Sequence, residues 1–223
     1  MKYYLTKFIL KKSVTGTYNQ TSPSPKNSDR SWFPDPYNYT QIQFDEFPNF
    51  IPKAYFELEE KGKYSDIVRI HNTHAKGFLI SPRVKALWEE FNIFSCAYYP
   101  AKLASESGEI RDYFLFHMAA KEVPGIDFEK STFNNEEEFL GIDDNDVWHY
   151  GQKKINKLSE RVGQNIILNK LYFTQDFPKY DLFYVPYFMY LDRFFISERL
   201  VKVMKKEKML GLAFMEQSII DEF

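Results

Sequence analysis

The chain has 223 residues, of which 44% are hydrophobic and 27% charged, and its formal net charge is −2 at pH 7. A chain of this length and balance can bury a sizeable core, which disfavours a disordered or membrane-spanning protein, and the near-neutral charge disfavours binding to nucleic acid or anionic membranes. The single cysteine, Cys96, excludes an intramolecular disulfide and a thiolate zinc cluster, and its apolar neighbours predict an inert buried thiol.

The N-terminal part predicts a strand followed by a long connection. Residues 3–10 (YYLTKFIL) are aromatic and β-branched enough for an opening strand, and they are too short and too charged for a signal peptide, so we expect the protein in the cytoplasm. Residues 13–37 are rich in Ser, Asn and Pro and predict an irregular loop that is either mobile or functional. Trp32 and Phe33 in this loop are candidate partner contacts, because exposed aromatic rings are costly unless they dock on another surface.

One phrase occurs twice without a gap. It reads FLISPRVKALWEEFNIFSCAYY at 78–99 and FFISERLVKVMKKEKMLGLAFM at 194–215. Each copy predicts a short strand, a serine that caps a helix, an amphipathic helix and a returning strand. Such a helix can bury its apolar stripe only on a sheet, so the two copies indicate a duplicated lobe or a pseudo-symmetric pair, although independent patterning of two capped helices stays open. The capping serines are Ser81 and Ser197, and the stripes are Val84, Leu87, Trp88 and Phe91 in the first copy and Leu200, Val203 and Met204 in the second.

The remaining elements set the fold class. A helical turn is predicted at 65–70 (SDIVRI), strands at 113–118, 123–128, 165–173 and 181–188, and an amphipathic helix at 152–163. Strands outnumber helices, so we expect a strand-rich α+β fold in which two similar strand–helix–strand units pack their helices on an antiparallel or mixed sheet. In domain terms we expect residues 1–52 to form an N-terminal strand plus a long loop, and residues 53–223 to form an α+β domain that contains the repeat (78–103 and 194–219) and an acidic insertion (134–146).

The acidic insertion is a candidate site for a partner. Its carboxylates stand together without a basic residue, and they do not fit the spacing of an EF-hand calcium loop. They form either a solvated loop or a surface that recognises a basic protein, because clustered carboxylates speed association with a cationic partner. The candidate carboxylates are Glu136, Glu137, Glu138, Asp143, Asp144 and Asp146.

Catalytic motifs are scarce. The sequence has no glycine-rich phosphate loop, no G-x-S-x-G and no H-E-x-x-H. His71 and His74 have the spacing of a metal pair on a helix, and His117 and His149 could join them in space, although loop histidines are more often solvated surface residues. A metal-dependent hydrolase that uses these histidines with a nearby carboxylate is therefore the alternative function, and an adaptor for an endogenous protein is a third.

A family resemblance favours a binding protein over an enzyme. The chain resembles the immunity proteins of bacterial polymorphic toxin systems, and more narrowly the immunity-protein-eleven family, formerly a domain of unknown function. The resemblance runs from about Lys53 to Met215 through KYSDIVRI, GFLISPRVKALWEEFNI, YYPAKL, YFLFHM, GIDFEKSTF, DLFYVPYF and RFFISERLVKVMKKEKMLGLAF, in that order.

The resemblance implies a cytoplasmic protein that neutralises a cognate toxin domain by occlusion, and we expect it to be non-catalytic, without cofactor or metal. The net charge and the lack of a long apolar stretch add the expectation that neither nucleic acid nor a membrane is a partner. The resemblance transfers no catalytic residue to this chain. Asp127 and Ser131 match a recurring turn of the family, and we expect their side chains to satisfy nearby backbone N–H groups.

Overall fold

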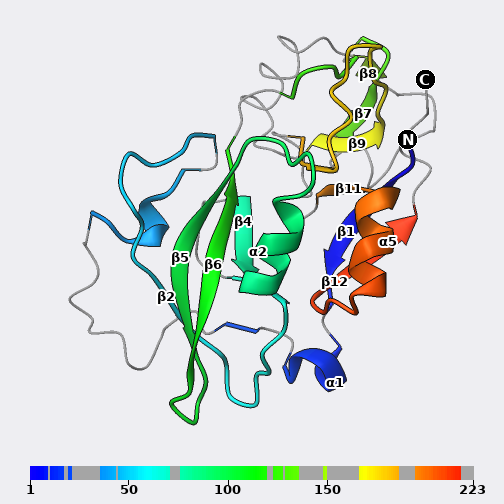
Figure 1. The fold of residues 1–223 in the computed structure, drawn as a ribbon. Helices are drawn as coiled ribbons and strands as arrows, with labels where there is room; N and C mark the ends of the chain where they lie inside the picture. Colours follow the sequence, from blue (N-terminus) through cyan, green and yellow to red (C-terminus); the bar gives the residue numbers. More distant parts are fainter. Residues whose placement is uncertain are drawn as a thin grey trace.

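The fold is a strand-rich α+β arrangement, as predicted (Figure 1). The computed structural model describes residues 1–9, 11–17, 20–21, 36–43, 45–70, 76–119, 123–127, 129–135, 148–149, 166–185 and 194–216. The strands are β1 (Tyr3–Phe8), β2 (Ala54–Glu57), β3 (Ile67–Val68), β4 (Lys76–Ile80), β5 (Cys96–Ala104), β6 (Ile110–Met118), β7 (Thr132–Asn135), β8 (Trp148–His149), β9 (Ile166–Lys170), β10 (Leu182–Phe183), β11 (Phe195–Ser197) and β12 (Leu212–Glu216). The helices are α1 (Lys12–Thr15), the 3-10 turn η2 (Tyr39–Gln41), α2 (Pro82–Trp88) and α5 (Glu198–Lys206).

Three sheets organise these strands. A four-stranded sheet has the order β10-β11-β1-β12, a five-stranded sheet has the order β2-β5-β6-β4-β3, and a three-stranded sheet has the order β8-β7-β9. The pairing of β2 with β5 is parallel and the other pairings of the five-stranded sheet are antiparallel, so this sheet is mixed. The first strand of the chain lies between two of the last, β11 and β12 (Figure 1).

Both copies of the repeated phrase fold as predicted, into strand, helix and returning strand. The first copy is β4-α2-β5 and the second is β11-α5-β12. Ser81 caps α2 by accepting a hydrogen bond from the N–H of Val84 at 3.3 Å, and Ser197 caps α5 by accepting one from the N–H of Leu200 at 3.2 Å. Each hydroxyl thereby satisfies a backbone donor that the first helical turn leaves open.

The fold has two corresponding halves, the five-stranded sheet with α2 and the four-stranded sheet with α5. Their correspondence extends beyond the repeated phrase. Strand β3 pairs with β4 at the edge of one sheet, and β10 pairs with β11 at the edge of the other. Strand β6 lies between β4 and β5, as β1 lies between β11 and β12. Phe114 of β6 faces Ile80, and Tyr4 of β1 faces Ile196, which stands 116 positions after Ile80; the pairings with β5 and β12 keep the same shift. The N-terminal strand therefore holds the place in one half that β6 holds in the other.

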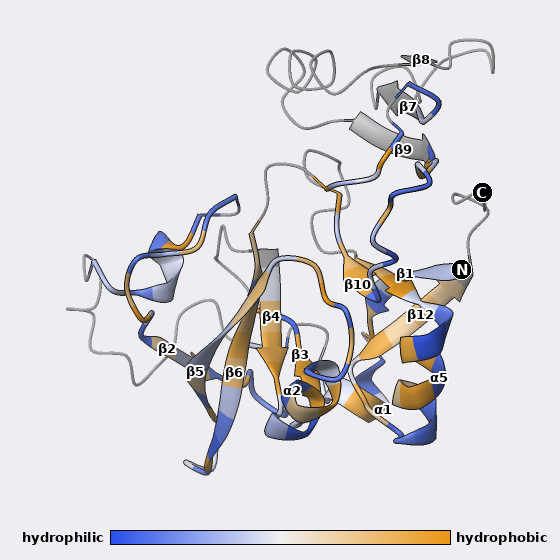
Figure 2. Cartoon of the chain, turned by 45° about the horizontal axis from the view of Figure 1, so that its top comes forward, coloured by the Kyte–Doolittle hydropathy of each residue, from blue (hydrophilic) through white to orange (hydrophobic). Residues whose placement is uncertain are grey.

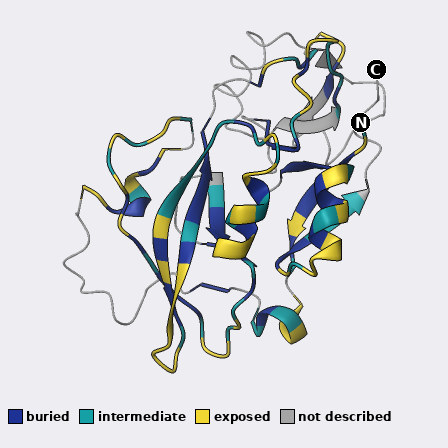
Figure 3. Ribbon diagram, viewed as in Figure 1, coloured by how far each residue is buried: buried dark blue, intermediate teal, exposed yellow. Residues whose placement is uncertain are grey.

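The main hydrophobic core is built by both halves. It contains buried side chains from β1, β4, β6 and β11 and from both long helices. Phe78 and Phe194 occupy the same position in the two copies, and their rings meet edge to face at 5.1 Å. Along β4 the side chains alternate, so that Phe78 and Ile80 enter this core while Leu79 enters a second cluster on the other face of the five-stranded sheet. The helices carry exposed residues only on the side turned away from the core (Figure 3).

Three local predictions were wrong. Residues 67–68 form strand β3 rather than a helical turn, because Ile67 and Val68 are β-branched and pair with β4 in the buried sheet. Residues 123–127 form a turn with an isolated bridge from Ile126 to Phe173 rather than a strand, since Gly125 has a φ of 77°. The loop predicted from residue 13 begins instead with the short helix α1. The helix predicted at 152–163 lies outside the described residues.

Candidate interaction site

The residues predicted from sequence to bind a partner stay predictions. The aromatic pair and the acidic cluster lie outside the part of the chain that the structure describes; these residues are Trp32, Phe33, Glu136, Glu137, Glu138, Asp143, Asp144 and Asp146. The basic residues Lys202, Lys205, Lys206 and Lys208 lie exposed on α5 and just after it, as the solvated face of an amphipathic helix.

Among the four histidines, the structure describes the side-chain contacts of His117. His71 and His74 lie outside the described residues, and His149 lies on β8. His117 is fully buried on β6, with its Nε2 3.3 Å from the carbonyl oxygen of Glu46 and its ring edge to face with Phe47 at 5.7 Å. Within the described ranges no three His, Cys, Asp or Glu side chains lie close enough together to hold a metal ion.

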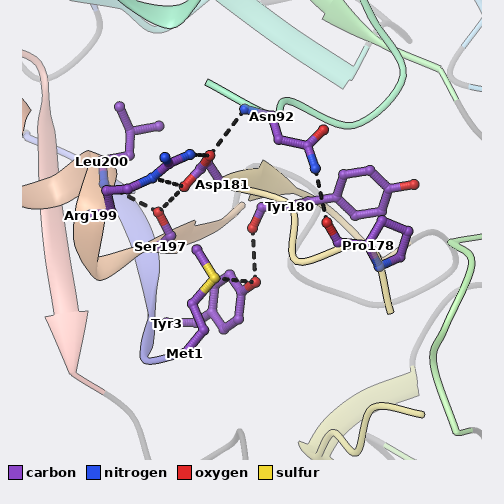
Figure 4. A network of polar contacts seen from close by, with 9 residues as sticks. All are labelled: Met1, Tyr3, Asn92, Pro178, Tyr180, Asp181, Ser197, Arg199 and Leu200. Atoms are coloured by element: carbon purple, nitrogen blue, oxygen red, sulfur yellow. Dashed lines mark hydrogen bonds and ion pairs between the residues drawn. The ribbon is translucent and has the colours of Figure 1, made fainter. Parts of the chain in front are cut away.

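The best-defined polar cluster centres on Asp181, which precedes β10 and is fully buried (Figure 4). Its Oδ1 accepts hydrogen bonds from the Ser197 hydroxyl at 2.6 Å and from Arg199 Nε at 3.2 Å. Its Oδ2 accepts from the backbone N–H of Asn92 at 3.0 Å and from Arg199 Nη2. The carboxylate thus ties the start of α5 to the loop that follows α2, which belongs to the other half of the molecule.

A second aspartate makes the matching set of contacts in the other half. Asp66, just before β3, accepts from the Ser81 hydroxyl at 3.1 Å and from Arg83 Nη2 at 3.2 Å. Its Oδ2 also accepts from the backbone N–H of Leu210 at 2.9 Å, in the loop that follows α5. Each half therefore holds the helix start of its own unit and the post-helix loop of its neighbour with one carboxylate.

The two helix-start arginines also cross between the halves. Arg83 donates to the carbonyl oxygen of Glu207 at 3.2 Å, and the guanidinium of Arg199 lies 4.9 Å from the ring centre of Phe91. Glu207 and Phe91 stand at the same position of the two copies. Each arginine therefore contacts the equivalent residue of the other copy, one through a hydrogen bond and the other through a cation–π contact.

Two tyrosine hydroxyls also occupy equivalent positions in the two halves. Tyr113 donates to the carbonyl oxygen of Ser65 at 2.7 Å, and Tyr3 donates to the carbonyl oxygen of Tyr180 at 2.8 Å, one residue before each aspartate. Burial raises the pKa of both hydroxyls well above the usual value for tyrosine. Both therefore stay protonated donors that fix the backbone beside the aspartates.

The electrostatics of Asp181 indicate a structural role. Burial acts to raise the pKa of this carboxyl, but the hydrogen bonds from Arg199, Ser197 and Asn92 outweigh burial and hold it below the usual value. The group is therefore ionised near neutral pH, and four donors already occupy its two oxygens. A carboxylate saturated in this way fastens the two halves together and offers no free oxygen to a substrate or a metal.

Sequence reasoning missed both aspartates, although a signal was present. The repeat extends backwards as Asp-Ile-Val at 66–68 and Asp-Leu-Phe at 181–183, each 15 or 16 residues before its Ser-x-Arg. The prediction that Asp127 and Ser131 are structural is confirmed. Asp127 Oδ1 accepts from the N–H of Lys130 at 3.1 Å, and the Ser131 hydroxyl accepts from the N–H of Tyr172 at 3.0 Å.

The model of the immunity protein family (Imm11) matches residues 6–218, nearly the whole chain. The chain belongs to this family. The resemblance found in the sequence is thereby confirmed. A comparison with curated proteins gave no match.

In this Imm11 protein, hydrogen bonds of Asp66 and Asp181 join the two halves in the interior, while several large apolar side chains lie at the surface. None of the described helices has both the length and the apolar character that crossing a bilayer requires. Five large apolar side chains are exposed in the described part of the chain: Tyr37, Phe47, Ile51, Ile110 and Leu210. These side chains reach the surface, whereas the carboxylate of Asp181 is buried.

Proposed function

We propose that this immunity protein neutralises a cognate bacterial toxin domain by binding it and covering the surface that the toxin needs for activity. The observation that carries the proposal is the family match over residues 6–218. The hydrogen bonds of Asp66 and Asp181 support a binding protein rather than an enzyme, because they hold the two halves together. The protein acts in the cytoplasm and requires neither a metal nor a cofactor.

A surface that is rigid before the partner arrives binds more tightly, because each side chain that must be ordered on binding costs free energy. The shared core and the two cross-connected aspartates supply that rigidity. The acidic residues of 136–146 would add recognition of a basic toxin, and if the toxin is a nuclease they would take the place of nucleic-acid phosphates. Trp32 and Phe33 would add aromatic contacts of the kind that dominate protein interfaces.

We further propose that the rigid platform arose by duplication of one unit. The ungapped sequence repeat, the common strand register and the paired contacts of Asp66 and Asp181 support a common origin. On this view β1 is the counterpart of β6, moved to the opposite end of the chain.

Co-expression tests the proposed function. The toxin domain encoded in the neighbouring gene is expressed alone and together with this chain, and growth and co-purification are scored. Rescue of growth with a stoichiometric complex is the expected result. Failure of the folded protein both to rescue and to bind would remove the proposal.

Stopped-flow association rates then test the acidic segment. Reversing the six carboxylates to lysine should slow association and flatten its dependence on salt, whereas reversing the exposed Glu60 and Glu106 should change neither. An unchanged rate in the six-fold variant would discard the electrostatic part of the proposal.

A further inference from the structure

Residues 38–43 and 45–53 belong to a closed loop with a fixed stem. Asn38 and Lys53 form a parallel bridge, the N–H of Lys53 donates to the carbonyl oxygen of Tyr37 at 2.7 Å, and the N–H of Tyr39 donates to that of Lys53 at 3.3 Å. The Asn38 side chain also accepts from the N–H of Thr40 at 2.9 Å. A loop of this length whose ends are tied together is an Ω-loop, a kind of surface segment that is frequently functional.

The underside of this Ω-loop is anchored in the protein. Tyr39 and Ile42 are buried in the second hydrophobic cluster, and the ring of Tyr39 lies 4.5 Å from that of Phe56 on β2. Further along, the loop contacts the buried His117 through the carbonyl oxygen of Glu46. The loop is thus held at its stem by the pairing of residues 38 and 53, and against the five-stranded sheet by Tyr39, Ile42 and the backbone of Glu46.

Three large apolar side chains of the Ω-loop and its stem are exposed, among exposed polar residues such as Gln43, Glu46 and Asn49. Tyr37 is 52% exposed, Phe47 43% and Ile51 75%, so this short stretch holds three of the five large apolar side chains that the described residues expose. Phe50, three residues before Lys53, packs edge to face on Tyr37 at 5.7 Å, and this contact adds to the stem. Figure 2 shows hydrophobic and hydrophilic stretches alternating along this loop ahead of β2. Single exposed apolar residues are ordinary, but a cluster on a fixed loop is typical of an interface.

Charge defines the partner further. Asp45 and Glu46 directly precede Phe47, and neither carboxylate takes part in an ion pair with another described residue. A partly exposed aromatic ring that packs on His117 and stands beside two such carboxylates complements an apolar pocket whose rim carries lysine or arginine.

We propose that the Ω-loop is a docking surface for the toxin domain, with Phe47 and Ile51 entering an apolar pocket and Asp45 and Glu46 facing cations on its rim. This inference rests on the proposed function and adds the surface that performs it. Because the loop is already fixed by its stem and by Tyr39 and Ile42, little conformational freedom is lost when the toxin binds.

Binding measurements on the full chain test the inference, with the toxin domain of the neighbouring gene, inactivated by mutation, as the probe. Phe47→Ala and Ile51→Lys should each weaken binding roughly tenfold or more, as expected for a residue at the centre of an interface. The variant Asp45→Lys/Glu46→Lys should bind several-fold more slowly at low salt. The matched control is Ile110→Ala, since Ile110 is 56% exposed but lies on β6, and its affinity should stay within about twofold of wild type.

Each outcome decides the question. Circular dichroism and urea unfolding show that each variant is folded, and Ile51→Lys is the safest because Ile51 is the most exposed of the set. If wild type binds and both loop variants bind equally well, the Ω-loop is not the docking surface while the proposed function stands. If wild type itself does not bind, the proposed function and the loop assignment both fall. If wild type forms a dimer in analytical ultracentrifugation that Ile51→Lys dissociates, the occupant is a second copy of this chain and the toxin assignment is wrong.

Discussion

Replacing Asp181 by alanine should destabilise the protein by about 3 kcal/mol, because buried donors that lose a charged acceptor cost about 1–3 kcal/mol each. Arg199 is 61% exposed and can turn to water, so its lost contact counts for little. The cost falls mainly on the buried Ser197 hydroxyl and less on the N–H of Asn92, an exposed residue whose hydrogen bond to Asp181 is part-buried. The same change at Asp66 should cost only about 1 kcal/mol, since its side chain is 18% exposed and water can replace the carboxylate.

Urea unfolding followed by tryptophan fluorescence measures the difference. For a protein of this size the larger loss lowers the midpoint by roughly 1 M, while Glu60→Gln, an exposed control, should leave it unchanged. Equal losses for the two alanine variants would refute the reasoning, because burial would then not decide the cost.

The pH dependence gives a second check on the same carboxylate. The pKa of Asp181 is lower in the folded protein than in the unfolded chain, so its contribution is complete above the unfolded value of about 3.9 and is lost as the pH falls through the folded value. The stability gap between wild type and Asp181→Asn should therefore narrow below about pH 4. A gap that stays constant down to pH 2.5 would contradict the assignment of a stabilised carboxylate.

Three further predictions follow from the backbone and the core. Gly211 has a φ of 125°, and a Cβ added there would lie 2.1 Å from the carbonyl oxygen of Ile67. Gly211→Ala should therefore lower the melting temperature far more than Gly108→Ala, whose added Cβ meets nothing within 4 Å. Similar shifts of the two variants in a thermal melt would argue against this. Cys96 is half-buried, and desolvation raises the pKa of its thiol, so its reaction with a disulfide reagent at pH 8 should be several-fold slower in the native protein than in urea; equal rates would show that the fold does not shield the thiol. If β1 is a displaced counterpart of β6, a chain in which residues 1–9 follow the C-terminus through a short linker should keep the native circular dichroism spectrum and toxin binding; a permutant that is unfolded with several linker lengths would exclude this relation.

The strand–helix–strand units could be predicted because their signals are local. An apolar stripe with helical spacing, a serine at the helix start and a short strand on either side all lie within about twenty residues. The same local logic failed at Ser65 and Asp66, which have the composition of a helix cap. Asp66 instead accepts hydrogen bonds from Ser81, Arg83 and Leu210, distant in sequence, and its neighbours Ile67 and Val68 pair into a sheet. No local pattern encodes such long-range use of a side chain.

The candidate interaction surface was harder to predict than the fold. The prolines around FPNFIP indicate a turn-rich connection, but whether Phe47 faces solvent or the core depends on where the Ile42 and Tyr39 side chains are buried. The fixed stem arises from a pairing between Asn38 and Lys53 that the sequence between them does not announce. Family membership predicted the kind of partner, whereas only the three-dimensional arrangement indicates a surface for it.

The position of β1 has a consequence for biosynthesis. A ribosome releases residues 3–8 long before residues 195–197 and 212–216, which form their pairing partners β11 and β12. The five-stranded sheet can close during translation before β11 and β12 have been made, whereas the four-stranded sheet must wait for them, with the hydrophobic strand β1 left unpaired meanwhile. We therefore expect nascent chains truncated before residue 212 to associate with chaperones far more than the finished product does.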